Sequence, residues 1–286
     1  MDLQMQTKPA WLKKKHITNP NQEIVEGILQ SLSLNTVCRE AMCPNYMECF
    51  AHKTATFLIL GKNCTRNCSF CNVRHCQPQP VEAGEPERVA KAVAGLGLRY
   101  VVVTSVTRDD LPDGGAGHFA AVVREIRKLN PGTAIEVLIP DFQGNESALA
   151  SVIDANPDVI SHNMETVRNL YGQVRPQADY QRSLGVLKNI AGTNSRIRGK
   201  SGIMAGLGET KKQVLELFSD LRSVNCSILT IGQYLSPSRE HYSVKEYVTP
   251  ETFDEYKKIA MEMGFEFVAS APFVRSSYHA SEALGL

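Results

Sequence analysis

Three cysteines, Cys64, Cys68 and Cys71, lie within eight residues of one another with a C-x3-C-x2-C spacing. They follow a short apolar run, 56–60, that has the composition of a buried strand. Three thiolates on one loop can hold a soft metal, as zinc or as an iron–sulfur cluster. A structural zinc ion requires four ligands, whereas a four-iron cluster can take three and leave one iron open. Since a fourth close ligand is missing, the loop favours a cluster whose open iron takes part in chemistry.

A second group of three cysteines precedes the first. Cys38, Cys43 and Cys49 have a C-x4-C-x5-C spacing, and Pro44 argues against one continuous helix through them. The chain has eight cysteines, and six of them lie between positions 38 and 71. In a reducing compartment such clustering indicates metal binding rather than disulfides. Ordinary buried cysteines or a zinc site are the alternatives for this second group.

The composition of the whole chain excludes some partners. The 286 residues carry a formal net charge of +1, and 43% of them are hydrophobic, as in a soluble globular protein. The near-neutral charge and the absence of basic–aromatic stripes argue against nucleic acid. No apolar run reaches the length of about 18 residues that a membrane span needs. The first residues lack the apolar core of a signal peptide, and no arginine precedes Arg39, so we expect a cytoplasmic protein.

From residue 56 onward, apolar strands alternate with amphipathic helices. The expected strands are 56–60, 100–103, 134–139, 158–160, 202–204, 227–231 and 265–268. The expected helices are 85–96, 116–129, 146–154, 182–190, 210–221 and 250–263, after a short one at 22–32. Strands that are apolar throughout predict a parallel sheet covered by helices, and right-handed crossovers curl such a sheet into a complete or partial barrel.

The expected fold is therefore α/β, a partial parallel (βα)6 barrel with N-terminal and C-terminal extensions. We expect residues 1–52 to form the extension with the second cysteine group, residues 53–235 the barrel, and residues 236–286 a C-terminal region that closes it. The site of such a barrel lies at the carboxyl ends of its strands. Polar segments follow three expected strands there, at 104–110, 162–166 and 233–234. This convergence on the cysteine loop predicts an enzyme.

Several segments resemble a known family. The C-x3-C-x2-C loop after a first strand is similar to that of the radical S-adenosylmethionine (SAM) superfamily, and the longer segments resemble lipoyl synthases. They are KPAWL at 8–12, TSVTRDDLPDGGA at 104–116, HNMET at 162–166, KSGIMAGLGET at 200–210 and RSSYHA at 275–280. The resemblance implies a barrel of the radical SAM type, SAM as a cofactor and two 4Fe-4S clusters.

The resemblance also implies a role for each cysteine group. Cys64, Cys68 and Cys71 would be catalytic, as ligands of the cluster that cleaves SAM reductively. Metal ligands of an auxiliary, sulfur-donating cluster would be Cys38, Cys43, Cys49 and a serine of the RSSY motif. In an extended segment Ser276 and Ser277 point opposite ways, so only one of them faces the cluster, and we favour Ser277.

Polar residues near the expected strand ends are candidates for binding SAM. An amide and a carboxylate, Asn163 and Glu165, suit ribose hydroxyls because both make directional hydrogen bonds. Ser105 is a candidate contact for the amino group of SAM, and Arg175 or Lys200 for its carboxylate. Simple solvation of a loop is the alternative interpretation for Asn163 and Glu165.

By resemblance, the protein is a sulfurtransferase of lipoate biosynthesis. It would insert sulfur at C6 and C8 of an octanoyl chain on a lysine of a lipoyl carrier domain. The implied carriers are the glycine cleavage H protein and the E2 subunits of 2-oxoacid dehydrogenases. A flavodoxin or ferredoxin would supply electrons, and an iron–sulfur carrier would repair the auxiliary cluster. The alternatives are a biotin-synthase-like enzyme or methylthiotransferase, or a non-catalytic iron–sulfur or zinc protein.

Overall fold

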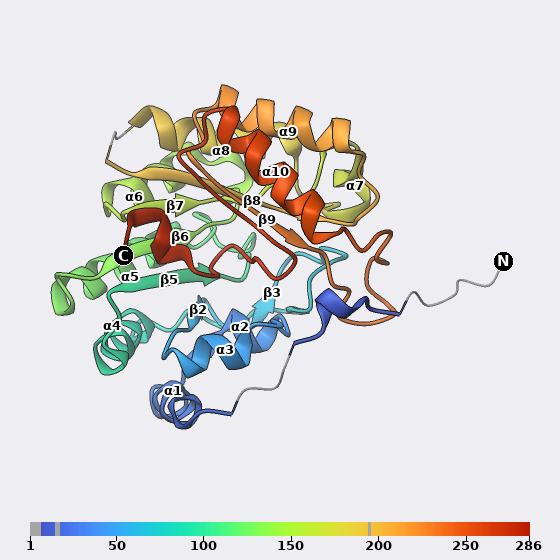
Figure 1. The fold of residues 1–286 in the computed structure, drawn as a ribbon. Coiled ribbons are helices and arrows are strands. Elements are labelled where there is room, and N and C mark those ends of the chain that lie inside the picture. Colours follow the sequence, from blue (N-terminus) through green and yellow to red (C-terminus); the bar gives the residue numbers. More distant parts are fainter. Residues whose placement is uncertain (1–6, 15–17, 194–195) are drawn as a thin grey trace.

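A single curved sheet organises the molecule (Figure 1). The computed structural model describes residues 7–14, 18–193 and 196–286. Among them, eight strands follow the order β1-β2-β5-β6-β7-β8-β9-β10, and neighbours from β2 to β10 are parallel, whereas β1 is antiparallel to β2. The strands are β1 Asn35–Thr36, β2 Thr56–Ile59, β5 Tyr100–Ser105, β6 Ala134–Leu138, β7 Val159–Ser161, β8 Arg198–Ala205, β9 Ile228–Gln233 and β10 Phe267–Ser270. The order is linear, so the described part of the chain forms a partial barrel, as predicted.

Helices connect these strands and cover the outer side of the sheet (Figure 1). The α-helices are α1 Pro20–Ser31, α2 Val37–Glu40, α3 Tyr46–Ala51, α4 Glu85–Leu96, α5 Ala116–Leu129, α6 Glu146–Asp154, α7 Tyr171–Val174, α8 Tyr180–Thr193, α9 Lys211–Ser223 and α10 Pro250–Glu262. Short 3-10 helices are η1 Ala10–Leu12, η2 Phe142–Gly144, η3 Arg168–Leu170 and η4 Ala280–Leu284. In the described ranges, no helix has the length and apolar character needed to cross a bilayer.

Local sequence signals account for the ends of several helices. The predicted bounds of α4, α5 and α6 are confirmed residue for residue. Helix α4 has a proline in its first turn and stops at Gly97, whose left-handed φ of 65° suits a residue without a Cβ. Thr210 caps α9, since its side chain accepts the backbone N–H of Gln213 while the Gln213 side chain accepts that of Thr210.

The sheet is larger than predicted in two respects. Seven parallel strands are present where a (βα)6 barrel has six, because the last expected strand, 265–268, joins the sheet as β10 and pairs in register with β9. Strand β8 begins at Arg198 rather than at residue 202, since Arg198 and Lys200 interrupt the apolar pattern that marks the other strands. A separate two-stranded sheet, β3 Asn63–Cys64 with β4 Arg74–His75, brackets the loop that carries Cys68 and Cys71.

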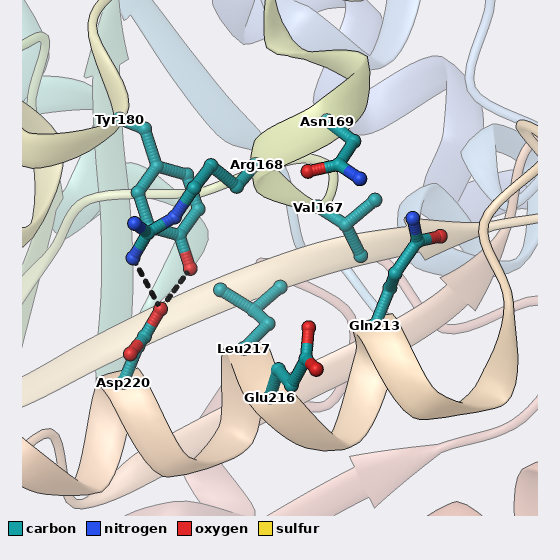
Figure 2. Close-up of a pocket in the computed structure, with 8 residues that line it drawn as sticks. All are labelled: Val167, Arg168, Asn169, Tyr180, Gln213, Glu216, Leu217 and Asp220. Atoms are coloured by element: carbon teal, nitrogen blue, oxygen red, sulfur yellow. Dashed lines mark hydrogen bonds and ion pairs between the residues drawn. The ribbon is translucent and has the colours of Figure 1, made fainter.

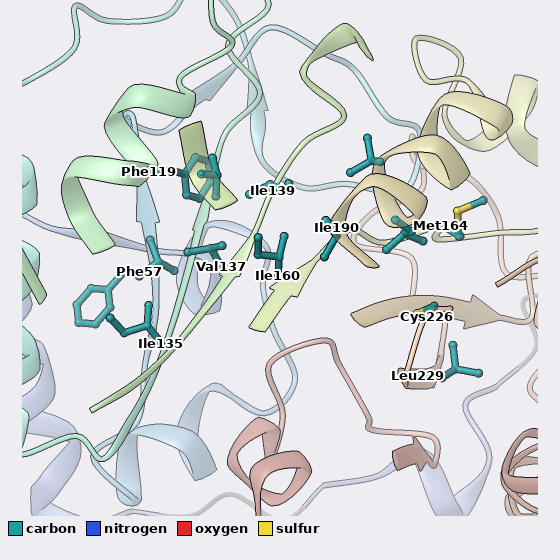
Figure 3. Packing of buried hydrophobic residues seen from close by; sticks show 14 of the residues in the cluster. Phe57, Phe119, Ile135, Val137, Ile139, Ile160, Met164, Ile190, Cys226 and Leu229 are labelled. Carbon is teal, nitrogen blue, oxygen red and sulfur yellow. The ribbon is translucent and has the colours of Figure 1, made fainter. Parts of the chain in front are cut away.

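The main core lies between the sheet and the outer helices. Strand residues Phe57, Ile135 and Ile160 pack with Phe119 of α5 and Ile190 of α8, and all five are at most 1% exposed (Figure 3). Burial of a large apolar side chain stabilises a fold by about 1.5–3 kcal/mol. The apolar faces of strands and helices therefore fix the frame on which the strand ends are arranged.

The segment η4 covers the amino-terminal ends of several strands. Ala283 of η4 packs against Val159, the first residue of β7, and Ile228, the first residue of β9. Nη1 of Arg198, at the start of β8, donates a hydrogen bond to the carbonyl of Ala283 at 2.6 Å. The end of the chain thus closes the floor of the partial barrel and leaves the carboxyl ends of the strands as its mouth.

Candidate active site at the mouth of the barrel

The first cysteine loop leaves β2 at the mouth of the barrel. Cys64 ends the short strand β3, and its sulfur accepts backbone N–H groups from Arg66 at 3.4 Å and Thr107 at 3.3 Å. A tight turn brings the backbone N–H of Cys71 to 3.0 Å from the carbonyl oxygen of Cys68. All three thiols are half-buried. The loop is therefore held from both sides, and Cys64 is tied to the segment that follows β5.

Electrostatic coupling shows that these three thiols lie together. Burial raises the pKa of Cys68, the charge of Arg175 lowers it, and repulsion by Cys64 raises it again. Burial also raises the pKa of Cys71 to about 12, with further repulsion from Cys68 and Cys64. Burial therefore disfavours the thiolate forms of Cys68 and Cys71, and a bound cationic metal would offset this cost. The residues present therefore fit a metal–sulfur cluster.

The second cysteine group lies on the elements that precede β2. Cys38 is on α2, Cys49 is on α3, and Cys43 lies on the turn between them, where Pro44 separates the two helices as predicted. Burial raises the pKa of Cys38 to about 11, with repulsion from Cys43. Burial raises that of Cys49 to about 12, with repulsion from both other thiols. This group fits a second metal–sulfur cluster for the same reason as the first.

The thiols of neither group converge closely enough to share a single metal ion. Within the described ranges, no three His, Cys, Asp or Glu side chains are close enough to hold one metal ion. A tetrahedral zinc ion has bonds of only about 2.3 Å to sulfur, whereas a cluster binds each cysteine at a different iron and accepts wider spacing.

The two cysteine groups face the same space. Asn72, which follows Cys71, donates from Nδ2 to the backbone carbonyl of Glu40 on α2 at 2.9 Å. Burial lowers the pKa of Arg275, and the charges of Cys43 and Glu165 raise it, so its guanidinium lies near both. The sheet edge, the N-terminal helices and the RSSY segment therefore meet at one mouth.

Three of the five predicted SAM contacts, Asn163, Glu165 and Arg175, are brought together there, and Ser105 ends β5 at the same side of the sheet. Asn163 donates to Glu165 at 3.0 Å, and Nη1 of Arg175 donates to the backbone carbonyl of Asn163 at 2.8 Å. Arg175 and Glu165 also interact electrostatically with each other, and Arg175 with Cys68. Ser105 Oγ, Asn163 Oδ1 and Arg175 Nε are buried without a hydrogen-bond partner among the described residues. Buried polar atoms are rarely left unpaired, so this group fits a polar ligand.

Lys200 requires a correction. Its ammonium lies 2.8 Å from Oε1 of Glu136. Oε2 of the same carboxylate accepts a hydrogen bond from the hydroxyl of Tyr100 at 2.6 Å. Lys200 is on β8 and Glu136 on β6, below the mouth, and their side chains are 1% and 0% exposed. The charge of Lys200 is thus used inside the barrel, and we withdraw it as a partner for the SAM carboxylate.

The RSSY segment crosses the mouth above β8 and β9. The hydroxyl of Ser276 accepts a hydrogen bond from Nδ2 of Asn163 at 2.6 Å. A Cβ at Gly202 on β8 would lie 3.0 Å from the same hydroxyl, so Gly202 leaves room for it. Ser276 is therefore directed toward the SAM candidates, and the segment forms a turn, with the Tyr278 N–H bonded to the Arg275 carbonyl at 3.0 Å, rather than the extended conformation that we expected.

A buried ion network supports the first cysteine loop, and sequence reasoning missed it. Arg66, inside the C-x3-C spacing, pairs with Asp109 after β5 and Asp141 after β6, both at 2.6 Å. Burial alone would raise the pKa of Asp141, but Arg66 lowers it to about 2. The position of Arg66 between Cys64 and Cys68 is the signal that points to it. His162, buried with an unpartnered Nε2, was also missed.

One surface pocket lies away from the mouth of the barrel. Figure 2 shows this pocket of about 300 Å³ between η3, α8 and α9, where Arg168 and Tyr180 both hydrogen-bond to Asp220. None of the predicted site residues lines it. The mouth of the barrel is therefore the candidate active site.

Comparison with known proteins agrees with this geometry. The family model described as the radical SAM superfamily matches residues 58–221. A lipoyl synthase of Alkaliphilus metalliredigens is 55% identical over 99% of this chain and 97% of its own length. One of Caldicellulosiruptor saccharolyticus is 58% identical over 97% of this chain and 98% of its own.

Solved structures of more distant proteins share the fold. Streptococcus suis SuiB bound to S-adenosylmethionine is 11% identical, with a TM-score of 0.58 over 87% of this chain and 60% of that one. Methylornithine synthase has a TM-score of 0.51 at 14% identity, over 90% of this chain and 87% of its own. The relatives that match nearly the whole chain are lipoyl synthases. They favour that family over a biotin-synthase-like enzyme, a methylthiotransferase or a non-catalytic protein. The chain belongs to the lipoyl synthase family of the radical SAM superfamily.

Proposed function

We propose that this chain inserts two sulfur atoms, at C6 and C8, into an octanoyl-lysine of a lipoyl carrier domain, and that two 4Fe-4S clusters divide the work. The observation that carries the proposal is the hydrogen bond from Asn72 to the carbonyl of Glu40, at 2.9 Å. It joins the loop after Cys71 to the helix of Cys38, so both thiol groups border one reaction space. A radical formed at one group can then act on a chain held next to the other.

The first site makes the radical. Cys64, Cys68 and Cys71 hold a cluster that, when bound, supplies an open iron and an electron to SAM. Ser105, Asn163, Glu165 and Arg175 orient SAM at the strand ends, with the charged Arg175 directed to its carboxylate. Their unpartnered buried atoms support this assignment.

The second site supplies sulfur. Cys38, Cys43 and Cys49 hold the auxiliary cluster, and Ser277 completes it. The hydrogen bond between Ser276 and Asn163 supports this choice, since it engages the neighbouring hydroxyl on the SAM side. An alkoxide is a weaker ligand than thiolate for soft iron, which suits a cluster that gives up its sulfur.

The partners follow from this chemistry. The substrate is an octanoylated carrier domain, either the glycine cleavage H protein or an E2 subunit of a 2-oxoacid dehydrogenase. A flavodoxin or ferredoxin in the cytoplasm supplies electrons, and an iron–sulfur carrier rebuilds the auxiliary cluster after turnover.

Two cysteine substitutions test the division of labour. Cys68→Ala should abolish formation of 5′-deoxyadenosine, whereas Cys43→Ala should abolish sulfur insertion and retain part of the SAM cleavage. The assay uses reconstituted protein, reductant, SAM and an octanoyl-lysine peptide, with both products measured by mass spectrometry. Exposed Cys76 provides the control, since Cys76→Ala should change neither product. Normal lipoyl yield from the Cys43 variant would refute the proposal.

A further inference from the structure

Three distant segments of the chain meet beside the second cysteine group. Lys14 lies in the N-terminal segment, Asn45 and Glu48 lie between Cys43 and Cys49, and Tyr278 belongs to the RSSY motif. The ammonium of Lys14 donates to Oδ1 of Asn45 at 2.5 Å and to Oε2 of Glu48 at 2.6 Å. Tyr278 donates from its hydroxyl to the other oxygen of Glu48 at 2.6 Å. Lys14 therefore connects the N-terminal segment to both sides of the auxiliary site.

The surroundings of Lys14 strengthen these contacts. Its ammonium lies 4.8 Å from the ring centroid of Phe273 and 5.4 Å from that of Tyr278. A cation over an aromatic face is attracted by the ring, and hydrogen bonds between charged groups are stronger than neutral ones. The side chains of Lys14 and Glu48 are only 26% and 24% exposed, so water screens the pair incompletely.

These contacts fasten the serine segment at both of its ends. On one side of Ser276 and Ser277, the carbonyl of Phe273 accepts a hydrogen bond from Nδ2 of Asn45 at 2.7 Å. On the other side, Tyr278 is held by Glu48. Asn45 is 1% exposed, so its amide is directed by these partners rather than by solvent. Lys14 hydrogen-bonds to both residues that hold the segment, Asn45 and Glu48. Its ammonium also lies over the aromatic ring at each end of the segment.

We propose that Lys14 is a positioning residue, which fixes the segment 273–278 against Cys43 and Cys49 so that the serine ligand reaches the auxiliary cluster. This inference rests on the proposed function, because it requires that cluster. Lys14 touches neither the cluster nor the substrate; it acts through Asn45 and Glu48. Without the charge of Lys14, Glu48 loses its lysine partner, and the rings of Phe273 and Tyr278 lose the ammonium that lies over them.

The test measures how fast the auxiliary cluster loses iron. In the full chain with Cys64, Cys68 and Cys71 replaced by alanine, only about four irons should remain after reconstitution. Lys14→Met keeps the aliphatic stem and removes the charge, and should release this iron to a chelator roughly tenfold faster. Lys14→Arg keeps the charge and should stay within about twofold of the parent. Lys13→Met, on the same segment, is the matched control and should equal the parent.

A second measurement separates positioning from general destabilisation. With all six cysteines intact, Lys14→Met should cleave SAM at the parental rate and melt within a few degrees of the parent. Equal iron release from the Lys14→Met and Lys13→Met chains would overturn the inference alone. Loss of iron from both cysteine groups together, with early melting, would also overturn it. A parent without any auxiliary iron would overturn the proposed function and the inference with it.

Discussion

Gly232 on β9 is the position at which a single added methyl group should separate sulfur insertion from SAM cleavage. A Cβ at Gly232 would lie 3.0 Å from the carbonyl carbon of Val274, closer still to its oxygen, and 3.1 Å from Nη1 of Arg275. Nonbonded carbons are in contact at about 3.5–4.0 Å. The nearest atoms belong to the backbone, which cannot rotate away as a flexible side chain does.

The magnitude follows from this geometry. To clear the new methyl group, the Val274 peptide has to move by about 1 Å, and Ser276 and Ser277 follow two and three residues later. Overpacking of this kind costs about 1–3 kcal/mol of stability. A displacement of about 1 Å in a catalytic arrangement costs roughly a hundredfold in rate. Gly232→Ala should therefore fold and slow sulfur insertion by about a hundredfold, with SAM cleavage reduced far less, because the displaced segment touches the SAM candidates only through the hydrogen bond of Ser276 with Asn163.

Single-turnover reactions with an octanoyl-lysine peptide measure this effect. Mass spectrometry follows the dithiolated peptide, and chromatography follows 5′-deoxyadenosine in the same samples. Gly185→Ala is the matched control, because a Cβ there meets nothing within 4 Å and the residue lies inside α8. That control should be neutral, or stabilise the protein by about 1 kcal/mol. If the Gly232 and Gly185 variants make lipoyl product equally fast, the steric reasoning is wrong.

Two further predictions concern stability. Lys200→Met should lower the free energy of unfolding by about 3 kcal/mol, since it leaves the buried Glu136 carboxylate without a cationic partner. The control is Lys91→Met, which breaks the exposed ion pair with Glu87 and should lower it by at most about 0.5 kcal/mol. Equal urea midpoints for the two variants would contradict this prediction. Burial lowers the pKa of His162 from 6.5 to about 4. The unfolded chain binds this proton at higher pH than the folded one, so metal-free protein should lose about 3 kcal/mol as the pH falls from 6.5 toward 4. His162→Asn should flatten that part of the stability–pH curve, and an unchanged curve would count against the assignment.

Periodicity and spacing predict the parts of this molecule that obey local rules. Helices α4, α5 and α6 combine an apolar stripe with identifiable starts, so their bounds follow from the sequence. The six clustered cysteines are recognisable because their short spacings are typical of metal ligands. The grouping of Asn163, Glu165 and Arg175 at the mouth follows from the rule that parallel strands end on one side.

Other features depend on contacts that no local pattern encodes. Lys200 has the residue type of an anion-binding group, but its partner Glu136 lies 64 positions away and two strands over. Arg198 and Lys200 conceal the true start of β8, because they interrupt its apolar pattern. Asn45 and Glu48 look like ordinary helix-end residues until the RSSY segment lies against them. Pairings of this kind are set by the tertiary fold, which overrides the local interpretation of a single residue.

The contacts of Asn45 and Glu48 with the segment 273–278 have a consequence for how the protein matures. Asn45 and Phe273 are 228 positions apart, and Glu48 and Tyr278 are 230 apart. A chain is synthesised from its N-terminus at about 5–20 residues per second, so all six cysteines and the SAM candidates emerge well before the serine segment. Iron loading during synthesis would therefore find the radical site complete and the auxiliary site open on one side. Under the proposed function, residues 273–278 would therefore close the three-cysteine site only after its cysteines had been synthesised.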